Sequence, residues 1–124
     1  MSSSRCPCLS GLPYDECCGP LHRAEQHAPT AERLMRSRFS AFALGDAAYL
    51  LRSWHASTRP ETLELDAGLR WYRLDIERTE RGGPFDLDGV VEFSAYYKGD
   101  ERGVQHEASR FVRDGADWFY LDAV

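Results

Sequence analysis

The spacing of hydrophobic residues divides the chain into three zones. Between residues 29 and 66 the hydrophobic positions recur every three or four residues, which is typical of amphipathic helices. After Gly68 they alternate with polar positions, as in strands that bury one face. The first zone has little periodicity and holds every cysteine. We therefore expect an N-terminal module over residues 1–28 and an α+β domain over residues 29–124.

The middle zone predicts two helices joined by a tight connection. Thr30 is suited to cap the first helix, because a threonine hydroxyl can accept a bond from an early helical amide. Gly45 is suited to end it, since glycine adopts the left-handed conformation without steric cost. The hydrophobic stripe between these two positions consists of Ala31, Leu34, Met35 and Phe42, with Arg38 among them and Phe39 beside them.

Asp46 provides a cap for a second helix, whose stripe ends at Trp54. The two helices are expected to form a helical hairpin. A proline favours the first turn of a helix, so Pro60 predicts a short third helix over residues 61–65.

The last zone predicts four strands, and turns that contain glycine separate them. These turns are too short for parallel crossovers, so neighbouring strands should be antiparallel. In the first strand, the alternation places Tyr72, Leu74 and Ile76 on one face. The predicted fold is α+β, with a helical layer packed on a curved antiparallel four-stranded sheet. The expected strands are residues 71–78, 90–98, 104–113 and 118–123.

Composition limits the classes of partner. Hydrophobic residues make up 43% of the chain and charged residues 28%, which are values typical of a globular domain. The formal net charge of −5 disfavours general binding to nucleic acid, whose phosphates are also negative. No hydrophobic run is long enough to span a bilayer or to form the core of a signal peptide. We therefore expect a cytoplasmic protein without a membrane partner, whose thiols are reduced.

The four cysteines have the spacing of a metal site. Cys6 and Cys8 lie two apart, eight residues follow, and Cys17 and Cys18 are adjacent. Zn²⁺ in structural sites takes four ligands in a tetrahedron, and each cysteine pair can supply one edge. Such a closed site has no open position for catalysis, so we expect a structural Zn²⁺ that gives this short segment its folding free energy.

Three alternatives to this zinc site remain open at the level of sequence. Two disulfides would need an oxidising compartment, which the rest of the chain does not indicate. A reactive thiol pair is a second alternative, although Cys-x-Cys differs from the usual redox motif Cys-x-x-Cys. His22 could also replace one cysteine as a ligand.

Arg38 is unusual because its charge falls within a hydrophobic helical stripe. One interpretation is an anion-binding arginine at the floor of a pocket. The other is a buried ion pair with a carboxylate of the sheet, either Glu92 or Glu107. We favour the ion pair, because structural pairs also explain buried charges.

Further candidate pocket residues lie on the strands and at the end of the second helix. His106 and Glu107 are neighbours on a strand, so their side chains point to opposite faces. Trp54 is expected in the core or along a cavity, and His55 is favoured as a cation near a helix C-terminus. The complete set of pocket candidates is Arg38, Trp54, His55, Glu92, His106 and Glu107.

The cysteine segment resembles the SEC-C motif found at the C-terminus of the translocase motor SecA. All four cysteines match the ligand positions, and Ser10, Gly11 and Tyr14 match the loop. In the translocase this loop carries lysines and the module binds a chaperone. The differences argue against the same partner here, because the corresponding positions hold Leu12, Pro13, Asp15 and Glu16.

The rest of the chain resembles the YchJ family of bacterial proteins. This resemblance implies a nuclear-transport-factor-2-like (NTF2-like) fold, in which a curved sheet wraps helices, often around a pocket. It implies no particular activity. The matching motifs are Arg36-Ser37-Arg38-Phe39-Ser40-Ala41-Phe42, Tyr49-Leu50-Leu51, Trp54-His55, Val91-Glu92-Phe93, His106-Glu107-x-Ser109-x-Phe111 and Trp118-x-Tyr120-x-Asp122.

These observations favour a zinc-binding adaptor or ligand-binding protein, with a protein partner at the zinc module or a small ligand in the α+β pocket. The alternative is a small enzyme of the isomerase, hydratase or hydrolase type that uses the same pocket. A lesser hypothesis is ribosome or nucleic-acid binding through the zinc module, which the acidic Asp15 and Glu16 oppose.

Overall fold

A curved antiparallel sheet wraps around helix α2 in the computed structural model, which describes residues 4–124. The strands follow one another in the order β1-β2-β3-β4, each antiparallel to its neighbour. This arrangement confirms the predicted α+β fold. The elements are η1 (Tyr14–Glu16), α1 (Cys18–His22), α2 (Ala31–Leu44), α3 (Ala47–Arg52), β1 (Arg70–Arg81), β2 (Asp88–Lys98), β3 (Arg102–Asp114) and β4 (Asp117–Ala123).

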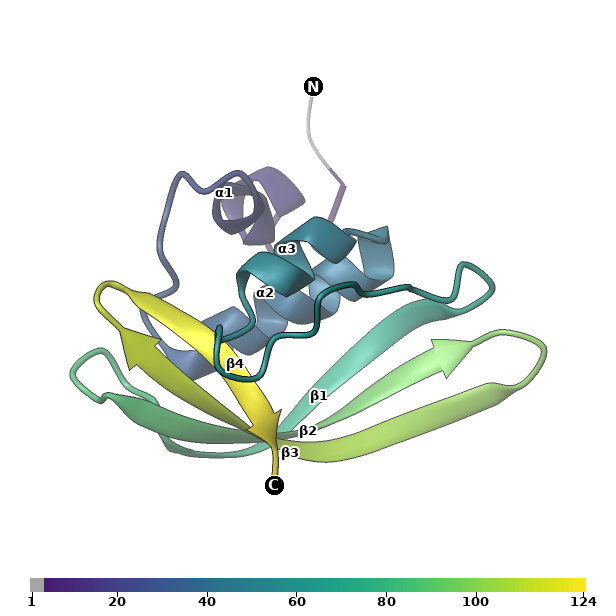
Figure 1. The fold of residues 1–124 in the computed structure, drawn as a ribbon. Coiled ribbons are helices and arrows are strands. Elements are labelled where there is room, and N and C mark those ends of the chain that lie inside the picture. Colours follow the sequence, from purple (N-terminus) through teal and green to yellow (C-terminus); the bar gives the residue numbers. More distant parts are fainter. Residues whose placement is uncertain (1–3) are drawn as a thin grey trace.

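Helix α2 lies between the sheet and the N-terminal segment. Figure 1 shows α2 and α3 in the concave side of the sheet, with α1 on the far side of these helices. The main core fills the space between α2 and the sheet, and its largest side chains include Phe39, Phe93, Phe111 and Trp118. Helix α2 therefore packs against the sheet on one side and faces the N-terminal segment on the other.

The predicted helix caps are confirmed. The Thr30 hydroxyl accepts a hydrogen bond from the Arg33 amide at 3.1 Å, and the Asp46 carboxylate accepts one from the Tyr49 amide at 3.0 Å. Gly45 has φ of 75°, in the left-handed region, and ends α2. The tight turn brings α3 against α2, where Ala41, Tyr49 and Leu50 form a small second core.

The predicted third helix is wrong. Residues 61–65 form no helix, and Leu63 and Leu65 both pack against the small core beside α3. Two side chains at a spacing of two residues can reach the same surface only from an extended backbone. Packing of these two leucines therefore overrides the weak helical signal of Pro60.

The four predicted strands are confirmed, with one correction in β1. The register between β1 and β2 shifts between Trp71 and Arg73, which marks a bulge. The bulge turns Tyr72 away from the face that carries the buried Leu74, and Tyr72 is 40% exposed. Its ring lies beside that of Tyr96, with centroids 6.3 Å apart.

The helices in the described part of the chain are all too short or too polar to cross a membrane.

Candidate metal centre and cavity

The four cysteine sulfurs form one buried cluster. Their Sγ atoms all lie within 4.8 Å of one another, and each residue is at most 3% exposed. The Cys8 and Cys17 sulfurs are 3.6 Å apart, and those of Cys17 and Cys18 are 4.0 Å apart. A tetrahedron of sulfurs around Zn²⁺ at about 2.3 Å has edges of about 3.8 Å. The cluster therefore has the size and the donor set of a four-thiolate metal site.

A tight chain reversal brings the two cysteine pairs together. Cys6 donates its amide to the Leu12 carbonyl at 2.9 Å, and Arg5 pairs with Pro13 in an isolated bridge. Gly11 has φ of 90°, which glycine adopts without steric cost. The chain then makes the short helix η1, and Cys18 begins α1. These two short helices were not predicted, because they have no room for hydrophobic periodicity.

Side chains of α2 and of the loop between the cysteine pairs form hydrogen bonds with the sulfurs. The Ser40 hydroxyl lies 3.4 Å from the Cys6 sulfur and 3.3 Å from the Cys18 sulfur. The Ser10 hydroxyl lies 3.1 Å from the Cys17 sulfur, and Arg33 Nη1 donates to Cys18 at 3.5 Å. Donors around a metal site orient its ligands and stabilise their charged form.

Two arginines of α2 also bind the backbone of the cysteine segment. Arg36 Nη1 donates to the Cys8 carbonyl at 3.0 Å, and Arg33 Nη2 donates to the Cys17 carbonyl. Four thiolates around one divalent cation would leave a net charge of about −2. These two guanidinium groups are therefore placed to balance that charge.

The thiols of the cluster shift one another's pKa values in opposite directions. Hydrogen bonds from Cys18 and Cys8 lower the pKa of the Cys6 thiol far below its usual range. The reciprocal bonds with Cys6 and Cys8, together with burial, raise the pKa of the Cys18 thiol. The Cys6 thiolate is thus stabilised by hydrogen bonds from its protonated neighbours. A metal ion binds thiolates, so its binding would replace the protons of the thiols.

His22 is engaged elsewhere and does not belong to the sulfur cluster. Its Nε2 donates to the Ser37 carbonyl at 2.8 Å, and its Nδ1 lies 2.6 Å from the Tyr14 hydroxyl. Its ring also packs against Tyr49, with centroids 4.5 Å apart. His22 therefore joins α1 to α2 and has no ring nitrogen left for a metal ion.

We expect Ser40→Ala to weaken metal affinity by about 10- to 100-fold without unfolding the chain, because the serine hydroxyl donates to the Cys18 sulfur and contacts the Cys6 sulfur, and the loss of such partners has effects of that size. Competition against a chelator of known affinity measures the change. Ser94→Ala is the matched control, since Ser94 is also buried but bonds Glu77 on the sheet. Equal affinities for the two variants would contradict this role of Ser40.

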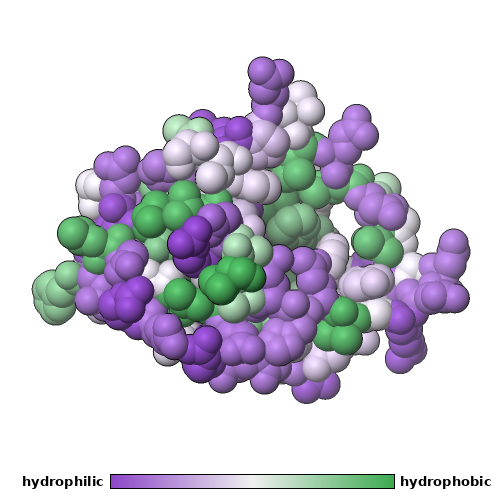
Figure 2. Space-filling view, turned by 60° about the horizontal axis from the view of Figure 1, so that its bottom comes forward, coloured by the Kyte–Doolittle hydropathy of each residue, from purple (hydrophilic) through white to green (hydrophobic). Residues whose placement is uncertain are grey.

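A cavity lies between α2 and the concave face of the sheet. Its volume is about 150 Å³, and hydrophobic and aromatic side chains make most of its wall. Figure 2 shows hydrophobic residues gathered around a hollow on the face turned forward, within a mainly hydrophilic surface. The lining residues are Met35, Arg38, Phe39, Phe42, Trp54, Trp71, Phe93, Ala95, Gln105, Glu107, Ser109 and Tyr120.

Arg38 is 4% exposed and lines this cavity, and it forms no ion pair with any other residue of the described range 4–124. Its Nη1 donates to the Leu50 carbonyl at 2.8 Å and to the Ser53 hydroxyl at 2.7 Å. The guanidinium carbon also lies 4.7 Å from the ring centroid of Tyr120 and 5.4 Å from that of Trp54. Burial lowers the pKa of Arg38 to about 10, so the side chain remains a cation at neutral pH.

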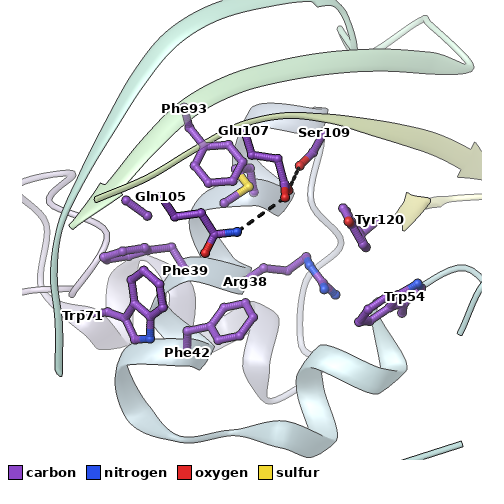
Figure 3. Close-up of a pocket in the computed structure, with 12 residues that line it drawn as sticks. Arg38, Phe39, Phe42, Trp54, Trp71, Phe93, Gln105, Glu107, Ser109 and Tyr120 are labelled. Carbon is purple, nitrogen blue, oxygen red and sulfur yellow. Dashed lines mark hydrogen bonds between the residues drawn. The ribbon is translucent and has the colours of Figure 1, made fainter. Parts of the chain in front are cut away.

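The ion pair that we favoured for Arg38 is therefore wrong. Carbonyl and hydroxyl oxygens, with two aromatic faces, make the direct contacts of the buried guanidinium, and the charge of Glu107 favours its cationic form without a direct ion pair. Glu107 does face the same cavity, but its oxygens accept from Ser109 Oγ at 2.7 Å and from Gln105 Nε2 at 3.4 Å. Figure 3 shows this polar trio on one wall and Arg38 between α2 and the Trp54–Tyr120 side.

Three of the six pocket candidates do not line the cavity. Glu92 and His106 bond each other at 2.7 Å on the other face of the sheet, where Arg78 also contacts Glu92 at 3.0 Å. Hydrogen bonds from Arg78 and His106 lower the pKa of Glu92. His55 follows α3, where its Nδ1 bonds the Ser57 hydroxyl. The structure thus brings together Arg38, Trp54 and Glu107.

Sequence reasoning missed several lining residues that strand alternation could have found. Gln105 lies two residues before Glu107 on β3 and so shares its face. Trp71 lines the cavity because of the bulge beside it, and the sequence carries no clear signal for that bulge. Phe42 was assigned to the core stripe of α2, and it lies at the end of that stripe where the cavity begins.

A curved sheet that wraps helices around a cavity, joined to a four-cysteine segment, defines an NTF2-like domain with a SEC-C motif. Residues 30–123 match the family described as "YchJ, middle NTF2-like domain", and residues 3–20 match the SEC-C motif. The chain belongs to the YchJ family. The SEC-C match and the sulfur cluster together indicate metal binding.

Relatives and solved structures agree with this assignment. A UPF0225 protein of Corynebacterium glutamicum is 55% identical over 94% of this chain and 93% of its own length. Another from Streptomyces coelicolor is 49% identical over 98% of this chain and 96% of its own. The solution structure of a SEC-C motif containing protein from Rhodopseudomonas palustris has a TM-score of 0.82 and 29% identity, and covers 96% of both chains. A Psychrobacter arcticus crystal structure with the same description has a TM-score of 0.77 and 29% identity, and the match covers 94% of this chain and 80% of that one.

Proposed function

We propose that this chain is a zinc-stabilised binding protein, in which residues 1–28 form the zinc module and residues 29–124 carry the ligand cavity. The observation that carries the zinc assignment is the approach of four buried sulfurs to within 4.8 Å of one another. Four thiolates suit Zn²⁺, and a site with four protein ligands leaves no position for substrate. The zinc would act as a cross-link between Cys6 and Cys8 on one side and Cys17 and Cys18 on the other.

Binding is favoured over catalysis by the composition of the cavity. Of the titratable pocket candidates, only Arg38 and Glu107 line it, whereas His55, Glu92 and His106 lie elsewhere. An isomerase, hydratase or hydrolase needs a group that takes a proton and a partner that returns it. Arg38 remains protonated at neutral pH, so it cannot complete such a pair with Glu107. Burial raises the pKa of Tyr120, the other titratable group of the cavity wall, so its phenol gives up a proton less readily.

The zinc module also offers a surface for a protein partner. Leu9 is 55% exposed and Leu12 49% exposed on the loop between the cysteine pairs. Asp15 and Glu16 follow on η1, and both are exposed. A partner with a small hydrophobic patch and basic residues would complement this surface. The zinc would hold the loop in the conformation that presents it.

Elemental analysis of the purified, reduced chain tests the metal assignment. We expect one zinc per chain, and loss of that zinc in Cys17→Ser, because serine does not replace a thiolate ligand. His22→Gln is the matched control, since His22 lies beside the module but bonds Tyr14 and Ser37 through both ring nitrogens. It should retain the metal. A wild-type chain without zinc would contradict the four-cysteine site. Loss of zinc in His22→Gln together with retention of zinc in Cys17→Ser would contradict it as well.

A further inference from the structure

The cavity has room for one six-membered ring. Its volume is about 150 Å³, and an apolar protein cavity of about that size holds a benzene molecule. Four aromatic side chains surround the end near α2, and Trp71 lies against Phe42 with ring centroids 6.0 Å apart. Aromatic walls favour a flat apolar group through edge and face contacts. These four residues, Phe39, Phe42, Trp71 and Phe93, are called the aromatic box below.

Arg38 gives the cavity a cation with one unused edge. Its two hydrogen bonds to the described chain both come from Nη1, to Leu50 and Ser53. The opposite edge of the guanidinium, formed by Nε and Nη2, therefore has no acceptor in residues 4–124. That edge carries two parallel N–H groups, whose spacing matches the two oxygens of a carboxylate. A buried charge without an ionic partner gains more from such a pair than an exposed one does.

Glu107 does not satisfy this edge, and its own oxygens have other partners. The carboxylate accepts from Ser109 at 2.7 Å and from Gln105 at 3.4 Å, and the described residues include no ion pair with Arg38. A cationic ligand would have to compete with these two donors for Glu107. An anionic ligand would meet an edge of Arg38 that nothing in the described chain fills.

We propose that the cavity binds a small carboxylate that carries a single ring, with the carboxylate on the Nε–Nη2 edge of Arg38 and the ring in the aromatic box. This inference deepens the proposed binding function and names the ligand class. The ring fits the volume, and the carboxylate pairs with the cation. The nearby Glu107 carboxylate opposes the ligand's charge, so it limits affinity for simple anions.

Titration of the zinc-loaded full chain with phenylacetate, followed by ¹H–¹⁵N NMR, tests the proposal. The chain has three tryptophans, so the three indole N–H signals report on binding. Trp54 and Trp71 line the cavity and their signals should shift. Trp118 does not line this cavity and donates to the Pro29 carbonyl, so its signal serves as an internal control. Phenylacetamide and phenethylamine, neutral and cationic analogues of similar size, should bind at least about tenfold more weakly, because hydrogen bonds between charged groups are the stronger ones.

Four variants separate the effect of charge on ligand binding from the effect of the shape of the cavity. Arg38→Met should weaken phenylacetate binding by about tenfold or more, whereas Arg110→Met should not, since Arg110 pairs with Asp122 on the exposed face. Glu107→Gln should strengthen phenylacetate binding, because it removes a like charge from the cavity. Ala95→Leu keeps Arg38 in place but fills part of the cavity, so it should abolish binding even if Arg38→Met fails to fold.

Equal binding of the anionic and neutral analogues, stronger binding of phenethylamine, or weaker phenylacetate binding in Glu107→Gln would overturn the role of Arg38. If none of the three compounds shifts the Trp54 and Trp71 signals at millimolar concentration, the ligand class is wrong. That failure leaves the metal assignment untouched, since elemental analysis decides it independently.

Discussion

Removal of the metal is expected to lower the unfolding temperature of this chain by on the order of 15 °C. A ligand present at 1,000 times its dissociation constant stabilises the folded state by about 4 kcal/mol, and for a chain of this size each kcal/mol shifts the midpoint by roughly 4 °C. The N-terminal segment has a small core, because the four cysteines form a cluster of their own and only Leu21 and Ala28 of this segment join the main core. Calorimetry of zinc-loaded and chelator-treated protein under reducing conditions measures the difference.

The remaining domain should still unfold cooperatively after chelation. Its main core, which includes Phe39 and Phe111, contains none of the cysteines. Cys8→Ser should reproduce the lower midpoint and show no further change with chelator. An unchanged midpoint in protein that elemental analysis shows to be metal-free would contradict a structural role for the metal.

Phe111→Ala is expected to destabilise the folded chain by about 3–5 kcal/mol, which is the usual effect of removing a buried phenylalanine side chain. Phe111 is fully buried on β3 and belongs to the main core between the sheet and α2. Domains of this kind have a total stability of about 5–15 kcal/mol, so the variant loses a large part of it. Urea denaturation followed by circular dichroism measures the change.

Phe85→Ala provides the matched control, because it removes the same side chain from the loop between β1 and β2, where Phe85 is 98% exposed. Its free energy of unfolding should change by less than about 0.5 kcal/mol. Equal losses in the two variants would show that the core lies elsewhere.

Local signals in the sequence were sufficient for helices α2 and α3, the strands and the sulfur cluster. Thr30, Gly45 and Asp46 act on backbone groups within a few residues, so their roles as caps follow from the sequence alone. The cysteine pairs are likewise close in sequence, and a short loop with Gly11 suffices to bring them together. Strand alternation separated His106 from Glu107 correctly, since neighbours on a strand point to opposite faces.

The contacts that define the cavity depend on distant parts of the chain, and there the sequence was insufficient. Arg38 finds its oxygen partners on α3 and the residue after it, which the helical stripe could not indicate. The bulge beside Trp71 places Tyr72 on the face opposite to Leu74, because one extra residue offsets the alternation before the bulge from that after it. Glu92 was grouped with the pocket although its partners, Arg78 and His106, lie on the other face of the sheet.

Helix α2 is shared by the two sites, which constrains its length. Ser40 on one side reaches two cysteine sulfurs, whereas Phe42 on the other side lines the cavity. Each residue of an α-helix adds about 100° of rotation. A single deletion at Ser37 would therefore turn both residues away from their sites at once. Insertions and deletions should instead accumulate in the connection between α3 and β1, where few side chains are buried.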